Sequence, residues 1–154
     1  DPVGAPARQP GRGGRRVAAM ERYVRDVMAD VKVRLTPSAT LRQAAVHLAA
    51  ARTGLAIVDI DGGGVLTERD VLRGIAAGID LDTATVGDHM TPQPIAVPPA
   101  TPLAEACDLM ISRGVRHLLV SEGETLVGVL NMRDVVGVLS GAAPLGAVPP
   151  ARGD

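Results

Sequence analysis

The sequence predicts an α+β fold made of two βαββα repeats packed about a pseudo-two-fold axis. The first observation is a duplicated stretch, because GVLTERD at residues 64–70 returns as GVLNMRD at residues 128–134. The second is that each copy follows a short apolar run typical of a strand and precedes a run with helical spacing. Two copies of one supersecondary unit usually bury each other's sheets, so the ends of both motifs should face a shared cleft.

The first repeat has the order strand, helix, strand, strand, helix, after a short helical turn at residues 24–28. Thr40 is a good N-cap, and the Asp-Gly-Gly of residues 61–63 is typical of a tight hairpin turn. We therefore expect strands at residues 33–35, 56–60 and 64–66 and helices at residues 41–52 and 68–77.

The second repeat follows the first without a gap over most of its length. Val58 recurs as Val120, an offset of 62 residues, whereas Asp70 recurs as Asp134, an offset of 64. The two additional residues belong to the second hairpin, around residues 122–125, where a loop can accommodate them.

Four segments follow from this pattern. Residues 20–80 form the first repeat and residues 81–140 the second. Residues 1–19 are rich in Gly, Pro, Ala and Arg, which is typical of a disordered tail or an extension, and residues 141–154 read as a loose C-terminal tail.

Composition excludes several classes of function. The formal net charge is −1, and the chain has no Trp, no Phe and one Tyr, so it offers neither the basic groove nor the stacking platforms of nucleic-acid binders. No apolar run reaches the roughly 18 residues of a membrane span. Cys107 is the only cysteine, so a disulfide framework is excluded and a reducing, cytoplasmic compartment is expected.

Each duplicated motif places an aspartate, Asp70 or Asp134, in the first turn of a helix. An ionised carboxylate accepts two hydrogen bonds at once, which suits the vicinal hydroxyls of a ribose. Thr67 can donate from its hydroxyl, and the free N–H groups of a helix N-terminus favour a phosphate. The alternative is that Thr67 and Asp70 form a capping box that needs no ligand.

These paired units, with Asp26-Val27-Met28 near the start and the repeated GVL motif, resemble a tandem pair of CBS domains, the Bateman module, over residues 24–139. The short chain and the linker GIAAGIDLDTATVGD are similar to those of stand-alone bacterial CBS-pair proteins of the hypoxic-response type. The resemblance implies binding of AMP, ADP, ATP or S-adenosylmethionine in two clefts between the repeats.

The resemblance also implies roles for individual residues. Thr67 and Asp70 would hold ribose in one cleft, and Asn131 and Asp134 in the other. The phosphates would meet basic residues before the middle strand, which are present in the second repeat and replaced by Thr53 and Gly54 in the first. Those basic residues are Arg116 and His117, and Arg69 and Arg133 beside the two aspartates are further candidates.

Two unequal sites are therefore expected, with the better ribose end at Asp70 and the better phosphate end at Asp134. By the same resemblance, adenine would lie against aliphatic side chains and main chain. For the Asp70 site these are Thr91, Ile95 and Val115, and for the Asp134 site Val33 and Leu55. The alternative for each of these five is a plain core position.

The resulting hypothesis is a regulatory sensor, not an enzyme, with an adenosyl ligand as regulator and no required cofactor. His47, His89, His117 and Cys107 are scattered, so no metal site is expected. A homodimer, an unidentified protein partner and a link to stress responses are further expectations. The alternative function is a ligand-free dimerisation or protein-interaction module that uses apolar helix residues, namely Leu72, Ile75, Val135 and Val138.

Overall fold

The computed structural model describes residues 21–141, and both predicted tails lie outside that range except for Gly141. The predicted order of elements is confirmed. The first repeat contains η1 (Val24–Asp26), β1 (Arg34–Leu35), α2 (Leu41–Ala51), β2 (Leu55–Val58), β3 (Gly64–Thr67) and α3 (Glu68–Ala76). The second contains α4 (Val86–His89), β4 (Thr91–Pro92), β5 (Ala96–Val97), α5 (Leu103–Arg113), β6 (His117–Glu122), β7 (Thr125–Asn131) and α6 (Met132–Ser140).

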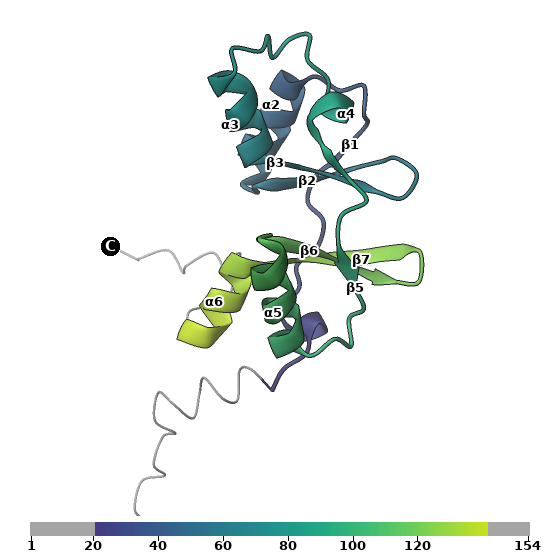
Figure 1. The fold of residues 1–154 in the computed structure, drawn as a ribbon, viewed down its shortest axis with the longest axis vertical. Coiled ribbons are helices and arrows are strands. Elements are labelled where there is room, and N and C mark those ends of the chain that lie inside the picture. Colours follow the sequence, from purple (N-terminus) through teal and green to yellow (C-terminus); the bar gives the residue numbers. More distant parts are fainter. Residues whose placement is uncertain (1–20, 142–154) are drawn as a thin grey trace, which may run out of the picture.

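The strands form two sheets with matching topology. In the first sheet, β1 is parallel to β2, and β2, β3 and β4 are antiparallel neighbours; in the second, β5 is parallel to β6 and β6 is antiparallel to β7. The sheets face each other across the middle of the molecule, and the longer helices lie on their outer sides (Figure 1). A thin apolar layer joins the sheets, made of Leu55, Ile57, Val65, Leu119 and Val129.

The second hairpin absorbs the two additional residues, as predicted. Val58 pairs with Gly64 in the first hairpin and Val120 with Gly128 in the second. The register of the second hairpin then shifts between Val120 and Ser121, and two more pairs form before the turn. A bulge in a solvent-facing hairpin changes the loop and leaves the rest of the ladder aligned.

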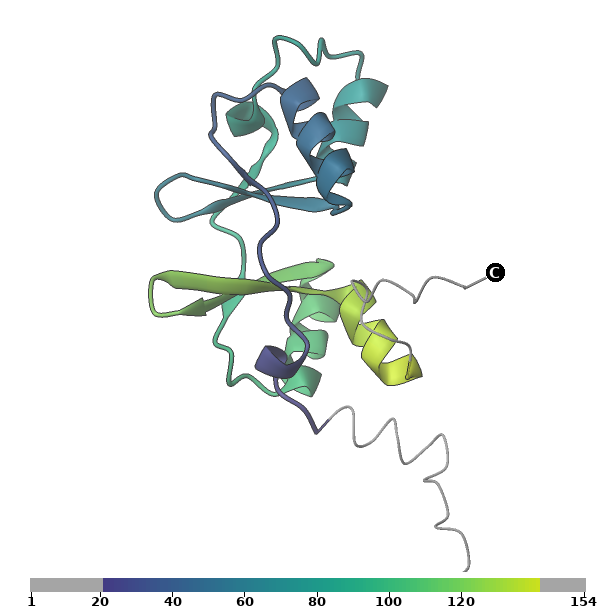
Figure 2. The ribbon, with the colours of Figure 1, turned by 180° about the vertical axis from the view of Figure 1, so that it is seen from behind.

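The opening segment of each repeat packs on the other repeat's core, which the sequence did not indicate. Val24 and Val27 lie in the core built by α5, β6 and α6, whereas Val86 lies in the core built by α2, β2 and β3. Ala29 pairs with Val129 of β7, and β4 pairs with β3. The chain crosses from one half of the molecule to the other after each opening segment, so two connections link the halves (Figure 2). Each predicted repeat is therefore contiguous in sequence but not in its packing.

The close packing of each opening segment on the other repeat explains one glycine of each motif. A Cβ on Gly64 would lie 2.8 Å from Sδ of Met90, and a Cβ on Gly128 would lie 2.9 Å from the carbonyl oxygen of Ala29. Both contacts come from the opening segment of the other repeat. Glycine therefore permits a close approach at both positions.

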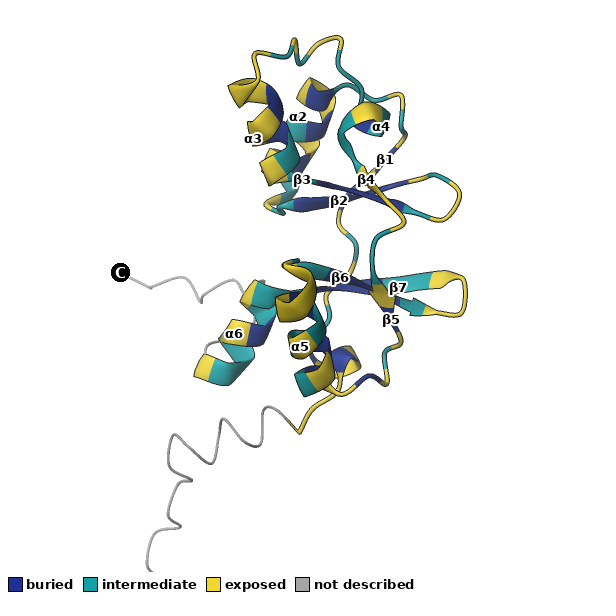
Figure 3. Cartoon of the chain, in the orientation of Figure 1, coloured by how far each residue is buried: buried dark blue, intermediate teal, exposed yellow. Residues whose placement is uncertain are grey.

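Burial separates the apolar helix residues that were expected to form an interaction surface. Leu72 and Ile75 of α3 are exposed, by 64% and 54%. Val135, at 1% exposure, and the partly buried Val138 pack into the second core instead (Figure 3). The expectation was wrong for these two because the inner face of α6 is the one that covers β6 and β7. None of the helices in residues 21–141 is long and apolar enough to cross a membrane.

Candidate functional site

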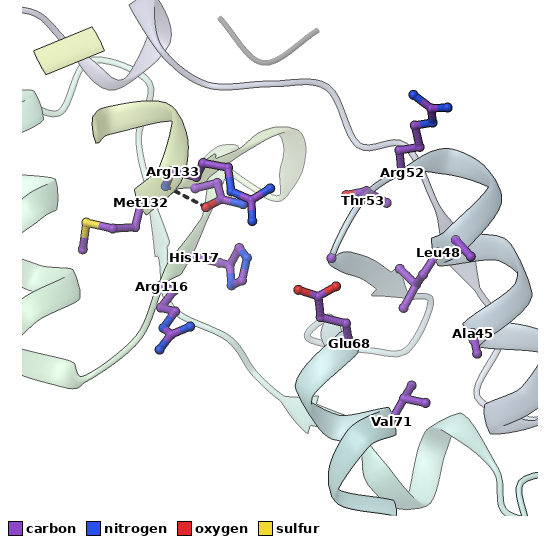
Figure 4. Close-up of a pocket in the computed structure, with 13 residues that line it drawn as sticks. Ala45, Leu48, Arg52, Thr53, Glu68, Val71, Arg116, His117, Met132 and Arg133 are labelled. Atoms are coloured by element: carbon purple, nitrogen blue, oxygen red, sulfur yellow. Dashed lines mark hydrogen bonds between the residues drawn. The ribbon is translucent and has the colours of Figure 1, made fainter. Parts of the chain in front are cut away.

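A pocket of about 620 Å³ lies where the two repeats meet on their helical side. One wall is apolar and comes mainly from α2, with Ala45, Leu48, Ala49 and Val71, while Met132 lies on the side of the second repeat. The remaining lining is polar or small, with Arg52, Thr53, Gly54 and Glu68 from the first repeat and Arg116, His117, Asn131 and Arg133 from the second. Figure 4 shows the two groups facing each other across the gap.

The second repeat presents its polar residues at the start of β6 and of α6. The backbone N–H of Met132 donates to the carbonyl oxygen of Arg116 at 2.9 Å, which fixes the two segments together. Asn131 is the N-cap of α6, and its Oδ1 accepts from the N–H of Arg133 at 2.9 Å. Arg133 and His117 point into the space between the repeats (Figure 4).

The first repeat has the same backbone arrangement at the starts of β2 and α3, with different side chains. The N–H of Glu68 donates to the carbonyl oxygen of Gly54 at 2.9 Å. Arg52 ends α2 with a left-handed φ of 52°, where the second copy has Gly114 with a φ of 64°. Arginine in this conformation is strained by about 1 kcal/mol relative to glycine. The structure thus keeps a cation at the rim of the pocket at a small cost.

The electrostatics of the lining favour an anion. Burial lowers the pKa of His117, and this effect outweighs the opposing influence of the Glu68 carboxylate, while Arg116 lowers the pKa further. His117 is therefore largely neutral near pH 7. The charged groups of the lining are three guanidiniums and one carboxylate.

The two motif aspartates have different surroundings. Oδ2 of Asp70 accepts from the N–H of Thr67 at 2.8 Å and from its hydroxyl at 3.1 Å, and the Thr67 hydroxyl accepts from the N–H of Asp70 at 3.4 Å. The predicted capping box is therefore confirmed. Arg73 lies 3.6 Å from Oδ1 of the same carboxylate.

The Asp134 carboxylate accepts no hydrogen bond from any residue between 21 and 141. Burial raises its pKa, and Lys32 and Arg133 act in the opposite direction. Asp134 is thus a half-buried carboxylate with two cations nearby and no protein donor within the described range. Such a group is available for hydrogen bonds from a ligand.

Four of the predicted site residues line the pocket together, namely Arg116, His117, Asn131 and Arg133. The others do not line it. Val33 lies in the first core and Leu55 in the layer between the sheets, whereas Ile95 and Val115 pack against the second core. Thr91 is exposed on β4, and Thr67, Asp70, Arg69 and Asp134 lie at the starts of α3 and α6.

Sequence reasoning missed Arg52, Glu68 and the apolar wall of α2. Arg52 precedes β2 as Arg116 precedes β6, but it stands two residues before Gly54, the equivalent of Arg116, so the repeat alignment pairs it with Gly114. Glu68 is part of the recognised motif, yet its identity is not repeated in the second copy, where Met132 takes its place. Within residues 21–141, no three His, Cys, Asp or Glu side chains gather as a metal site would require.

Known proteins resemble this chain in sequence and in fold. The family model for the CBS domain matches residues 24–77 and 86–141. Arabinose 5-phosphate isomerase KdsD of Yersinia pestis is 36% identical over 105 residues, which are 66% of this chain and 32% of the isomerase. The chain thus spans about a third of the length of that relative.

Two solved structures are informative. A CBS domain protein from Pyrobaculum aerophilum, complexed with AMP, is 29% identical with a TM-score of 0.66, covering 79% of this chain and 100% of the other. Hypoxic Response Protein I, with two coordinated zinc ions, is 28% identical with a TM-score of 0.61, covering 75% of this chain and 97% of the other. With both repeats matched by the family model and the same fold in these neighbours, the chain belongs to the CBS domain family as a tandem CBS pair.

Proposed function

We propose that this chain is a regulatory module that binds an adenosine-containing ligand, with its phosphate in the pocket between the repeats. The observation that carries the proposal is the gathering of Arg116, His117 and Arg133 at the N-terminus of α6, with Arg52 at the rim. Guanidinium groups recognise phosphate oxygens with paired hydrogen bonds, and a helix N-terminus adds free N–H groups and a positive dipole end.

The size and lining of the pocket support a small-molecule ligand. Its volume of about 620 Å³ falls in the range of ligand sites, about 300–1,000 Å³. The wall formed by Ala45, Leu48 and Ala49 adds an aliphatic surface to the polar lining. The AMP complex of the Pyrobaculum neighbour supports an adenine nucleotide as the ligand.

Roles for the remaining residues are part of this proposal. Asp134 binds the ribose of the ligand whose phosphate meets Arg116 and His117, and Asn131 assists it. Thr67 and Asp70, with Arg69, serve the second cleft, where the ribose would have to share a carboxylate with the helix cap. The adenine slots are those predicted from the resemblance, with Val33 and Leu55 for Asp134 and with Thr91, Ile95 and Val115 for Asp70.

Among adenosyl ligands, AMP, ADP and ATP fit this pocket better than S-adenosylmethionine. The sulfonium of S-adenosylmethionine is positive, and it would lie among three guanidiniums that only Glu68 offsets. The match with the isomerase covers about a third of that enzyme, and isomerase activity is not part of the proposal.

Calorimetric titration with AMP, ADP, ATP and S-adenosylmethionine tests the proposal. Arg116→Ala and Asp134→Ala should each weaken nucleotide binding ten- to a hundredfold, about 1.5–3 kcal/mol, because each loses a charged hydrogen bond. Arg113→Ala, an exposed arginine in the last turn of α5, is the matched control and should bind as the wild type does. No heat with any of the four ligands at millimolar concentration would refute the proposal.

We also propose that the module forms a homodimer in the reducing cytoplasm. Exposed apolar side chains on three helices support an interaction surface, namely Leu72, Ile75, Ile111 and Val136. Light scattering should give the mass of a dimer, and Leu72→Glu should shift it toward a monomer. A wild-type protein that stays monomeric at high concentration would contradict this.

A further inference from the structure

Glu68 is the one acidic residue in the lining of the pocket, and its backbone position is fixed. It is the first residue of α3, with its N–H bound to the carbonyl oxygen of Gly54 at 2.9 Å. A Cβ on Gly54 would lie 3.1 Å from Cδ and Oε1 of Glu68. The missing side chain of Gly54 therefore leaves the space in which the Glu68 carboxylate lies.

This carboxylate faces the cations of the other repeat. Figure 4 shows it pointing toward His117 across the gap. Its charge raises the pKa of His117, but this effect is smaller than the lowering of that pKa by burial. The equivalent positions in the second repeat are Met132 for Glu68 and Arg116 for Gly54, so the carboxylate of the lining lies on the side of the first repeat and two of the three guanidiniums lie on the other side.

We propose that Glu68 is the residue that sets the charge of the ligand accepted by this pocket, so that a nucleoside monophosphate is preferred over a triphosphate. The inference rests on the proposed function and deepens it. With His117 neutral, three guanidiniums and one carboxylate give the lining a net charge of +2. A phosphate monoester carries about −1.5 to −2 near pH 7, which matches this charge.

A longer phosphate chain has more negative charge than the lining can balance. Additional phosphates in the pocket would also come close to Glu68, because its carboxylate projects into the gap between the two repeats (Figure 4). Coulomb repulsion grows with the charge of the ligand, so Glu68 weakens ATP binding more than AMP binding.

The test compares AMP and ATP binding to the wild type and to Glu68→Gln by calorimetry. The wild type should bind AMP more tightly than ATP. The variant should gain about twofold for AMP and about fivefold for ATP, because Glu68 is exposed and its field is partly screened. Glu105→Gln is the matched control, since Glu105 is an exposed glutamate in the first turn of α5 outside the pocket.

Inorganic phosphate and tripolyphosphate provide a second measurement, followed through the NMR signals of the His117 ring. Glu68→Gln should strengthen tripolyphosphate binding more than phosphate binding. A variant that gains equally for both anions, or binds either nucleotide more weakly, would overturn the role of Glu68. If neither nucleotide binds the wild type, the proposed function fails, whereas the inorganic anions still decide the role of Glu68.

Discussion

The two copies of the motif, at residues 64–70 and 128–134, have nearly the same sequence and use their aspartates differently. In the first copy, Thr67 and Asp70 satisfy each other in a capping box. In the second, Asn131 caps α6 by accepting a hydrogen bond from the N–H of Arg133, which is two residues further along the chain, whereas Thr67 accepts from a residue three positions along. Asp134 therefore has no reciprocal role in the cap. A single change from threonine to asparagine accompanies the difference between a structural carboxylate and one that a ligand can use.

The same asymmetry extends across the pocket. Leu55 fills the layer between the sheets in the first copy, whereas the equivalent His117 lines the pocket in the second. Gly54 and Glu68 of the first copy are replaced by Arg116 and Met132 in the second. Duplication thus supplies the scaffold twice, and a few side-chain differences place the carboxylate of the lining on one side and two of its three guanidiniums on the other.

The largest expected difference between the copies concerns their glycines. Gly128→Ala should destabilise the fold by about 1–3 kcal/mol, because the new methyl group would lie against the backbone oxygen of Ala29. Gly64→Ala should cost less than about 1 kcal/mol, because it meets the flexible end of Met90. Urea denaturation measures both, and equal losses would show that the two crossings are equally rigid.

Replacing each aspartate should affect stability differently, because Asp70 belongs to a helix cap and Asp134 does not. Asp70→Ala should lose about 0.5–2 kcal/mol of stability, because the capping box is broken. Asp134→Ala should change the free energy of unfolding by less than about 0.5 kcal/mol, because burial already disfavours its charged form. Thermal and chemical unfolding of both variants check this, and a larger loss for Asp134→Ala would reverse the assignment.

The C-caps of α2 and α5 offer a smaller effect. Arg52→Gly should stabilise the protein by about 0.5–1 kcal/mol, because glycine adopts a positive φ without strain. Gly114→Ala should destabilise it by a similar amount for the same reason. If Arg52→Gly also weakens nucleotide binding, the strained conformation at Arg52 serves the pocket; unchanged binding would show that the arginine is not used.

His117 should make the stability of the protein depend on pH, whereas Leu55, its equivalent in the first repeat, cannot. Because the pKa of His117 is lowered in the folded state, the unfolded chain binds more protons below the ordinary value of 6.5. Stability is therefore lost as the pH falls through this window. His117→Leu, which copies the first repeat, should reduce the loss of melting temperature between pH 7.5 and 5.5, values chosen to lie about one unit on either side of that pKa. His47→Leu on the exposed side of α2 is the control, and an equal change there would contradict the role of His117.

The element order, the repeat offset and the loop that absorbs two residues could be predicted because they depend on local signals. Apolar spacing, the Thr40 cap and the Asp-Gly-Gly turn act within a few residues of chain. Arg116 and His117 were expected from the family resemblance, and both line the pocket. Arg52 and Glu68 were missed because neither has a counterpart of the same type in the second copy.

By itself, the sequence determined two βαββα units and the residue types at the end of each motif. Only the tertiary structure decided that each opening segment packs on the other repeat, because that choice depends on contacts between residues far apart along the chain, such as Ala29 with Val129, which are 100 positions apart. It also decided which charged groups meet. Arg52, Glu68, Arg116 and Arg133 are distant along the chain, and the packing of the two sheets brings them to one pocket.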